Sequence, residues 1–198
     1  ANGHSTARPL EMVFIRAPRN SRVGPGVRVL ARHGYPRALV SGGGDVVAGE
    51  PPPGRAGWHV LVQPLDEETH SVVLEIARAA VSTSGDRYQC VEIEGVRYAH
   101  IIDPGTGLGR TARAAATVVA ADGATADALA TALCVLEPES GLELARTQGA
   151  EARVLFEENG TWRTCESEGW AQIMAGPAER ALALEQDPSL TTRPNRAQ

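Results

Sequence analysis

The 198-residue sequence contains no lysine: all 19 of its basic residues are arginine, against 24 acidic residues and a net charge of −5. An acidic chain without a basic face is not typical of a nucleic-acid-binding protein, so this balance argues against that class. The absence of lysine also means that no lysine of this chain can act as a nucleophile or as a ligand for phosphate.

Cysteine is also scarce, with three widely spaced residues, Cys90, Cys134 and Cys165. They form no Cys-x-x-Cys pair and no cluster with histidine, so neither a zinc site nor a disulfide framework is implied. No apolar run approaches the roughly 20 residues that a membrane-spanning helix needs. A membrane can therefore be contacted only as a surface or through an anchor outside this sequence. Residue 1 is alanine and no signal peptide is recognised, which fits a processed chain or a fragment.

Hydrophobic residues make up 42% of the chain and charged residues 22%, which is typical of a globular protein, and the length suggests one domain. We expect residues 1–26 to be poorly structured, residues 27–185 to form the domain, and residues 186–198 to be a disordered tail. Strand and helix patterns follow one another in mixed order. This order predicts an α/β or α+β fold in which helices cover the faces of a mixed β-sheet.

The hydrophobic pattern predicts a helix that ends near Gly34, a second over residues 125–136 with Thr125 as its N-cap, and a third over residues 140–148. Strands are expected at residues 38–40, 46–49, 58–65, 70–79, 115–120 and 152–156. Two hairpins are expected, one joining residues 88–93 to 96–102 across Glu94-Gly95, the other joining residues 152–156 to 161–165 across Asn159-Gly160.

The stretch from His100 to Gly107, His-Ile-Ile-Asp-Pro-Gly-Thr-Gly, has the composition of a strand that ends in a tight turn. Pro104 fixes φ and the glycines permit positive φ, so the backbone of the turn can approach a ligand closely. The strand would deliver the imidazole of His100 and the carboxylate of Asp103 to that turn, and Asp103 would hold the imidazole across it. The structural alternative is a surface hairpin loop with an incidental histidine, because such turn chemistry is common.

Asp127 and Thr131 are the only strongly polar residues of the predicted helix after its start, and their spacing of four places both side chains on one face. Because a carboxylate on a buried helix needs a counter-charge, a hard divalent cation would fit here. Mg²⁺ prefers such oxygen ligands with positions left open for phosphate. Alternatively, Asp127 lies in the first turn and only stabilises the positive end of the helix dipole, while Thr131 bonds back to a carbonyl.

Two further segments could bind an anionic group. Residues 42–45, Gly-Gly-Gly-Asp, follow a predicted buried strand, and their glycines leave main-chain amides unshielded. This segment is neither a Gly-x-Gly-x-x-Gly nor a Walker loop, because no lysine and no correctly spaced helix follow. Residues 82–86 supply hydroxyl groups and a tight turn, which suits a phosphate or no ligand at all.

Read together and in order, these segments resemble the ApbE family of FAD:protein FMN transferases. The family's motifs stand here as Gly43-Gly44-Asp45, Trp58, Thr83-Ser84-Gly85-Asp86, His100 to Gly107 and Ala126 to Ala132. The match covers about residues 36–156, and five ordered motifs are far more specific than any one. The sequence departs from the family at residues 23–27. The family has Gly-Gly-x-x-Lys-Gly-Tyr there, but these residues of the chain contain no lysine. The chain is therefore either a fragment or out of pattern in its first 26 residues.

The resemblance implies an ApbE-like, T-fold-like domain that transfers FMN from FAD to a threonine or serine of a partner protein, with Mg²⁺ and with release of AMP. It implies that Asp127 and Thr131 hold Mg²⁺ and that His100 and Asp103 are catalytic. The residues that it implies for binding FAD are Gly43, Gly44, Asp45, Ser84, Gly85, Asp86, His100, Ile102, Thr106 and Gly107. It also implies a periplasmic or membrane-associated location. A metal-dependent FAD pyrophosphatase and a non-catalytic flavin-binding relic remain as alternatives.

Overall fold

The computed structural model describes residues 13–17, 23–63, 71–86 and 89–177. The elements in chain order are β1 (Val13–Ala17), α1 (Val23–Arg32), β2 (Ala38–Gly42), β3 (Asp45–Ala48), β4 (Trp58–Val62), β5 (Val72–Ile76), β6 (Ala80–Gly85), β7 (Cys90–Ile93), β8 (Val96–Ala99), β9 (Ile102–Asp103), β10 (Leu108–Gly109), β11 (Ala114–Ala120), α2 (Gly123–Leu133), α3 (Pro138–Thr147), β12 (Glu151–Glu158), β13 (Thr161–Glu166) and α4 (Trp170–Ile173). This mixed order is the predicted α+β class.

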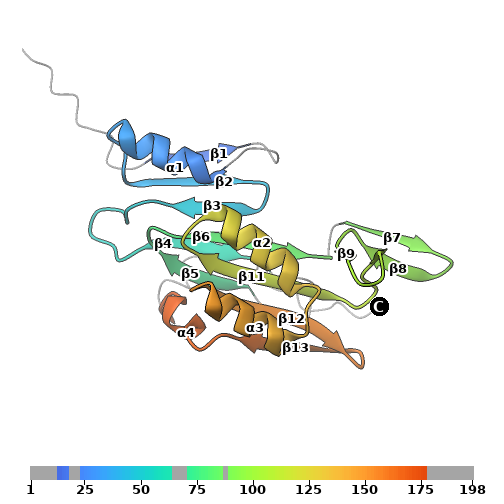
Figure 1. Ribbon diagram of the computed structural model, residues 1–198. Helices are drawn as coiled ribbons and strands as arrows, with labels where there is room; N and C mark the ends of the chain where they lie inside the picture. Colours follow the sequence, from blue (N-terminus) through green and yellow to red (C-terminus); the bar gives the residue numbers. More distant parts are fainter. Residues whose placement is uncertain (1–12, 18–22, 64–70, 87–88, 178–198) are drawn as a thin grey trace, which may run out of the picture.

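Seven strands form one mixed sheet in the order β1-β2-β3-β6-β11-β12-β13 (Figure 1). β1 and β2 are parallel because α1 connects them as a crossover, and the other neighbouring pairs are antiparallel. β11 lies between β6 and β12 and is buried at every position. It is therefore the strand on which both faces of the fold are built.

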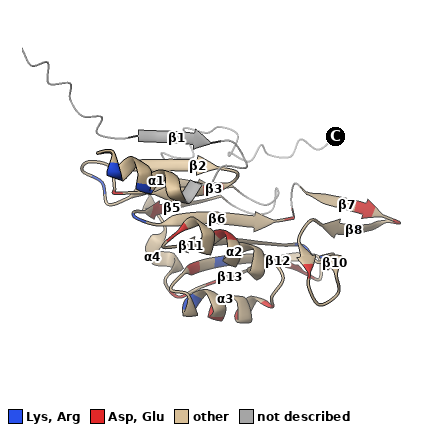
Figure 2. Cartoon of the chain, turned by 45° about the horizontal axis from the view of Figure 1, so that its top comes forward, with Lys and Arg blue, Asp and Glu red and all other residues tan. Residues whose placement is uncertain are grey.

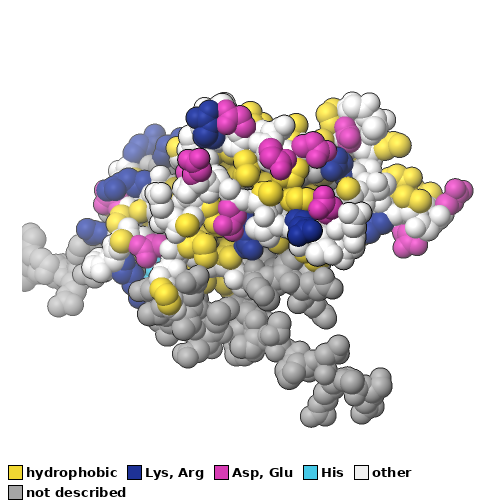
Figure 3. All heavy atoms as spheres, turned by 90° about the horizontal axis from the view of Figure 1, so that it is seen from below, with side chains coloured by type: hydrophobic (Ala, Val, Ile, Leu, Met, Phe, Trp, Pro, Cys, Tyr) yellow, Lys and Arg dark blue, Asp and Glu magenta, His cyan; other side chains and the backbone are white. Residues whose placement is uncertain are grey.

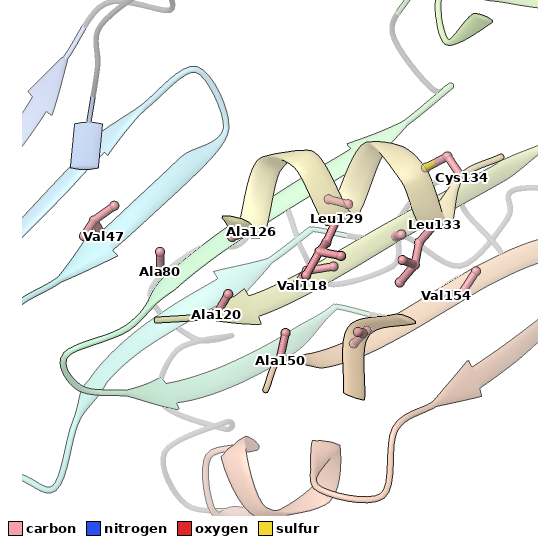
Figure 4. Close-up of a cluster of buried hydrophobic side chains, with 14 of the residues drawn as sticks. Val47, Ala80, Val118, Ala120, Ala126, Leu129, Leu133, Cys134, Ala150 and Val154 are labelled. Atoms are coloured by element: carbon pink, nitrogen blue, oxygen red, sulfur yellow. The ribbon is translucent and has the colours of Figure 1, made fainter. Parts of the chain in front are cut away.

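Alternation along the strands sends neighbouring side chains to two separate cores. Val118 belongs to the core beneath α1, α2 and α3, where Leu129 and Leu133 of α2 pack above the sheet (Figure 4). Val119, the next residue, belongs to the second core with Trp170 of α4 and the β4–β5 pair. Helices thus cover one face of the sheet, and the β4–β5 pair with α4 covers the other.

The β7–β8 hairpin and the short β9–β10 pair project from one end of the main sheet (Figures 1 and 2). Glu94 and Gly95 form the predicted two-residue turn, with φ of +53° and +77°. β8 ends at Ala99, earlier than predicted, because Ile102 pairs instead with Gly109 in the β9–β10 pair.

Further sequence predictions about element limits are also wrong. Within residues 1–26, the structure has a strand at Val13–Ala17, and α1 already begins at Val23. This segment forms a strand because it pairs with β2, a contact that local sequence does not reveal. The single strand predicted over residues 70–79 is instead divided at Arg78, whose φ of +50° turns the chain from β5 into β6. The predicted start of α2 is treated below, and residues 186–198 lie outside the described residues.

The surface of the described residues shows no strong separation of charge on the face drawn in Figure 3, where arginine, acidic and apolar side chains are interspersed. Acidic residues, drawn as red segments of the ribbon, also lie on the projecting hairpin in Figure 2. None of the helices within the described ranges is long and apolar enough to cross a bilayer.

Candidate functional site

Helix α2 presents Asp127 and Thr131 on its outer face, where both side chains are exposed. The opposite face packs on the sheet through Ala126, Leu129, Ala130 and Leu133. The expectation of a carboxylate on a buried helix is therefore wrong. The helix is buried along one stripe only, and alanines on its outer face, such as Ala128, hide this one-sidedness in the sequence.

Helix α2 begins at Gly123, because Asp122 rather than the predicted Thr125 is its N-cap. The Oδ1 atom of Asp122 accepts hydrogen bonds from the main-chain N–H groups of Ala124 at 3.0 Å and Thr125 at 3.1 Å. Hydrogen bonds from the main chain and hydroxyl of Thr125 lower the pKa of Asp122. With this start, the first turn holds no acidic residue, so Asp127 is not the first-turn dipole partner of the structural alternative.

The end of β6 lies alongside α2 and adds a second hydroxyl to its outer face. Ser84 Oγ is 3.0 Å from Thr131 Oγ1. The thiol of Cys134 donates to the main-chain oxygen of Ser84 at 3.4 Å, which fixes the strand end against the helix. Ser84, predicted to bind flavin, therefore shares a hydrogen bond with Thr131, predicted to bind metal, and Asp127 lies one helical turn before Thr131 on the same face of α2. These three residues are called the oxygen cluster below.

A cavity of about 780 Å³ lies beside α1, β3 and the N-terminal half of α2. Its charged lining consists of Asp45, Asp122, Asp127, Arg28, Arg78 and Glu50. In Figure 2, blue segments mark basic residues on α1 and red segments mark acidic residues at α2. The two arginines were not singled out in the sequence. The signal that could have found them is the absence of lysine, which leaves arginine as the cation for an anionic ligand.

Asp45 and Asp127 both line this cavity, and the negative charge of Asp127 affects the pKa of Asp45. Burial raises the pKa of Asp45, a hydrogen bond from Ser82 opposes that rise, and the negative charge of Asp127 adds to it. The Ser82 Oγ atom donates this bond to Asp45 Oδ1 at 2.6 Å. A cation near the two carboxylates would offset their mutual repulsion.

Gly43 and Gly44 form the turn between β2 and β3, with φ of +71° and +108°. Because Gly42 pairs with Asp45 across this turn, the positive φ of a two-residue hairpin explains both glycines. Asp45 lines the cavity and the two glycines do not. A flavin contact at Gly43 and Gly44 stays a prediction.

His100 is exposed, yet its position is fixed from both sides. Its main-chain N–H donates to the carbonyl oxygen of Gln89 at 3.0 Å, and the next residue, Ile101, is buried in the core that includes α2. The ring atom Nδ1 lies 3.2 Å from the same carbonyl oxygen. Because a carbonyl oxygen only accepts, Nδ1 carries the proton, and Nε2 of the neutral ring is left to accept one.

Asp103 shapes its own turn, and Gln89 takes the predicted role of holding the imidazole of His100. The Oδ1 atom of Asp103 accepts from the N–H of Gly105 at 2.8 Å, and its carbonyl oxygen accepts from Gly107 at 2.8 Å. Gln89 was missed because residues 89 and 100 meet only when β7 and β8 pair. The other predicted flavin contacts of the turn, Ile102, Thr106 and Gly107, are exposed.

Gly85 and Asp86, also predicted to bind flavin, have structural partners. A Cβ at Gly85 would lie 2.7 Å from the Cβ of Ala115, so the close packing of β6 on β11 explains this glycine. Asp86 is 2% exposed. Its carboxylate pairs with Arg97, and Arg113 Nε lies 3.7 Å from the same oxygen.

The His100 loop meets α2 at the C-terminal end of the helix, where Arg110 donates to the carbonyl oxygen of Val135 at 3.1 Å. Asp127 lies toward the other end of α2, at the cavity, and Thr131 lies one turn further along. Within the described ranges, no group of three His, Cys, Asp or Glu side chains could hold a metal ion. A cation site on α2 would therefore combine carboxylate with hydroxyl oxygens.

A mixed sheet with helices on one face, and a cavity with charged residues in its lining beside the start of α2, define an α+β domain with a candidate ligand site in the described part of the chain. The chain belongs to the ApbE family, whose model matches residues 23–156. The family resemblance seen in the five motifs is thereby confirmed.

Relatives with curated names and solved structures agree with this assignment. The chain is 33% identical over 156 residues to the FAD:protein FMN transferase of Klebsiella pneumoniae (strain 342), covering 75% of this chain and 43% of that protein. It is 34% identical over 144 residues to that of Escherichia coli K12, covering 69% and 40%. The chain thus spans about two-fifths of the length of these relatives.

Among solved structures, the flavin transferase ApbE from Vibrio cholerae has a TM-score of 0.62 at 28% identity, covering 76% of this chain and 50% of that one. The apo flavinyl transferase ApbE from Pseudomonas stutzeri has a TM-score of 0.53 at 31% identity, covering 67% and 42%. The fold described here is therefore shared with ApbE flavin transferases.

Proposed function

We propose that this chain takes part in Mg²⁺-dependent transfer of FMN from FAD to a threonine or serine hydroxyl of a partner protein. Its family and the names of its relatives support flavin transfer. Within the chain, the observation that carries the proposal is the oxygen cluster: the hydroxyls of Ser84 and Thr131 are in contact, and Asp127, one helical turn before Thr131, lines the cavity.

The residues of this cluster fit Mg²⁺. Asp127 and Thr131 would hold the ion, because Mg²⁺ binds through one or two carboxylates and completes its coordination with water and substrate phosphate. Burial is the main cause of the raised pKa of Asp45, and the negative charge of Asp127 adds to it, as expected where a cation could lie near both carboxylates. When bound, the ion would neutralise charge that develops on the pyrophosphate of FAD.

Other side chains would bind the phosphates of FAD and accept the proton of the acceptor hydroxyl. Arg28 and Arg78 line the cavity and supply the cations that a lysine-free chain can offer to phosphate. The acceptor hydroxyl oxygen attacks the phosphorus on the FMN side, and the bond from that phosphorus to the bridging oxygen breaks. AMP leaves with that oxygen. Nε2 of His100 accepts the hydroxyl proton, and the exposure of His100 lets a protein acceptor reach it.

Product analysis with FAD, MgCl₂ and a panel of threonine-containing acceptor peptides tests this proposal. We expect AMP by chromatography and an FMN adduct on a peptide by mass spectrometry. Asp127→Ala should lose both products, together with Mg²⁺ binding in a calorimetric titration. His100→Ala should slow labelling by about a hundredfold to ten-thousandfold, the usual contribution of a general base. Glu143→Gln, an exposed carboxylate on α3 paired with Arg146, is the control and should keep the wild-type rate.

Each other outcome selects an alternative. Free FMN and AMP without labelled peptide would replace transfer by FAD pyrophosphatase activity. FAD binding without either product would leave a non-catalytic flavin-binding protein. Unchanged Mg²⁺ affinity in Asp127→Ala would remove the metal role of Asp127, and labelling at the wild-type rate by His100→Ala would remove the base.

A further inference from the structure

Asp86 and Arg97 join two strands of different sheets. Asp86 directly follows β6 of the main sheet, and Arg97 lies on β8 of the projecting hairpin. One guanidinium nitrogen of Arg97 donates to the carboxylate of Asp86, and the other donates to its main-chain oxygen. A planar guanidinium that donates to two acceptors on one residue fixes both the separation and the orientation of the two strands.

Asp86 and Arg97 each lie within three residues, along the chain, of a residue of the candidate site. On β6, Ser84 lies two residues before Asp86 and is hydrogen-bonded to Thr131 of α2. On the hairpin, His100 lies three residues after Arg97, at the point where the chain leaves β8. The pair therefore connects the strand end that supports the oxygen cluster with the strand that delivers the imidazole.

The surroundings of Arg97 favour its charged form. Burial lowers the pKa of Arg97, but the hydrogen bond and the charge of Asp86 outweigh this, and the pKa is raised overall. Arg113 also lies 3.7 Å from the Asp86 carboxylate and places its guanidinium 4.8 Å from the ring centre of Trp162. Three charged side chains thus meet at the end of β6.

Stability alone is a weak explanation for this pair. Removing a carboxylate from water costs free energy that the attraction to an arginine offsets only in part. Among the described residues, the second carboxylate oxygen of Asp86 is buried without a hydrogen-bond partner, which adds to that cost. A two-stranded hairpin, by contrast, is marginally stable by itself and needs a fixed attachment to hold one geometry.

We propose that the Asp86–Arg97 pair is a clamp that positions His100 for proton transfer, so that both are positioning residues of the reaction. This inference rests on the proposed function of His100. A loosened clamp would let the hairpin move relative to α2, and the imidazole would spend less time at the distance from the acceptor hydroxyl that proton transfer needs. Misplacement by about 1 Å can cost about a hundredfold in rate.

Arg97→Lys tests the clamp, because lysine keeps the charge but cannot donate to both acceptors in one plane. The matched control is Arg153→Lys: Arg153 pairs with Glu166 at 3.3 Å across β12 and β13, and its side chain is 13% exposed. We expect kcat for FMN transfer to fall about tenfold to a hundredfold in Arg97→Lys, with little change in KM for FAD. Hydrogen exchange at the His100 amide should become faster. Asp86→Asn, which keeps an acceptor oxygen for Arg97, should show the same changes to a smaller degree.

The two readouts separate this inference from the proposed function. Equal losses of kcat in Arg97→Lys and Arg153→Lys would overturn the clamp, and so would a wild-type kcat in Arg97→Lys. If the wild-type chain transfers no FMN, the proposed function fails, but hydrogen exchange still decides the clamp. An unchanged exchange rate at His100 in Arg97→Lys would then refute it.

Discussion

Replacing Asp122 by alanine removes the N-cap of α2 and should lower the free energy of unfolding by about 1 kcal/mol. The side chain accepts two main-chain hydrogen bonds, at 3.0 and 3.1 Å, from amides that have no partner within the helix. Loss of such a cap costs about 0.5–2 kcal/mol. Because Asp122 is exposed, water can solvate the freed amides, which keeps the cost away from the upper end of this range.

The pH dependence of this effect has a definite sign. Hydrogen bonds from Thr125 and Ala124 lower the pKa of Asp122 in the folded chain. The charged cap therefore contributes its full stability above the ordinary carboxyl pKa and loses it as pH falls through the lower, folded value. Asp122→Asn keeps an acceptor oxygen without a titrating charge. The difference in unfolding free energy between wild type and Asp122→Asn should therefore shrink as the solution is acidified.

Urea unfolding followed by circular dichroism, at neutral and at acidic pH, measures both effects. Glu137 gives a matched control, because it is the N-cap residue of α3 but makes no side-chain capping bond. Glu137→Ala should change the unfolding free energy little. Equal losses in Asp122→Ala and Glu137→Ala, or a difference from Asp122→Asn that grows in acid, would refute the capping argument.

Two further predictions concern the packing of β6, β11 and α2. Gly85→Ala should lower the unfolding free energy by about 1–3 kcal/mol, because a Cβ there would lie 2.7 Å from the Cβ of Ala115 and two central strands would have to separate. Gly26→Ala in α1, where a new Cβ would meet its nearest neighbour at 3.6 Å, should instead be neutral or stabilising in the same urea experiment, and the reverse ranking would contradict the packing. Cys134 is buried, and burial raises the pKa of its thiol to about 12, so a thiol reagent near neutral pH should modify exposed Cys90 first and Cys134 only on unfolding. Rapid modification of Cys134 in the folded chain would show that the end of α2 does not pack against the sheet as described.

Local sequence was sufficient for features that depend on neighbouring residues. The Asn159-Gly160 turn was predicted from its composition, and both residues have positive φ, of +52° and +74°. The pattern of residues 115–120 predicted a strand, and β11 is that strand. The five ordered motifs were sufficient to predict the family. Turn composition and hydrophobic periodicity are properties of short segments, so they can be predicted without knowledge of the rest of the chain.

Contacts between distant segments were decided only by the tertiary structure. Ser84 and Thr131 are 47 residues apart and share a hydrogen bond because α2 packs across β6 and β11. Asp45 and Ser82 are 37 residues apart and meet because β3 pairs with β6. The strand order places these neighbours, and no periodicity within a segment encodes that order.

The sequence by itself therefore determined which residues carry oxygen atoms and an imidazole, and in which segments they stand. It did not determine that Asp127 is exposed, nor that Gln89 rather than Asp103 holds His100. An alanine-rich helix looks apolar on every side, and only its packing against β6 and β11 selects the face that is buried. A hydrogen bond between two hairpin strands likewise exists only in the register that the folded hairpin adopts.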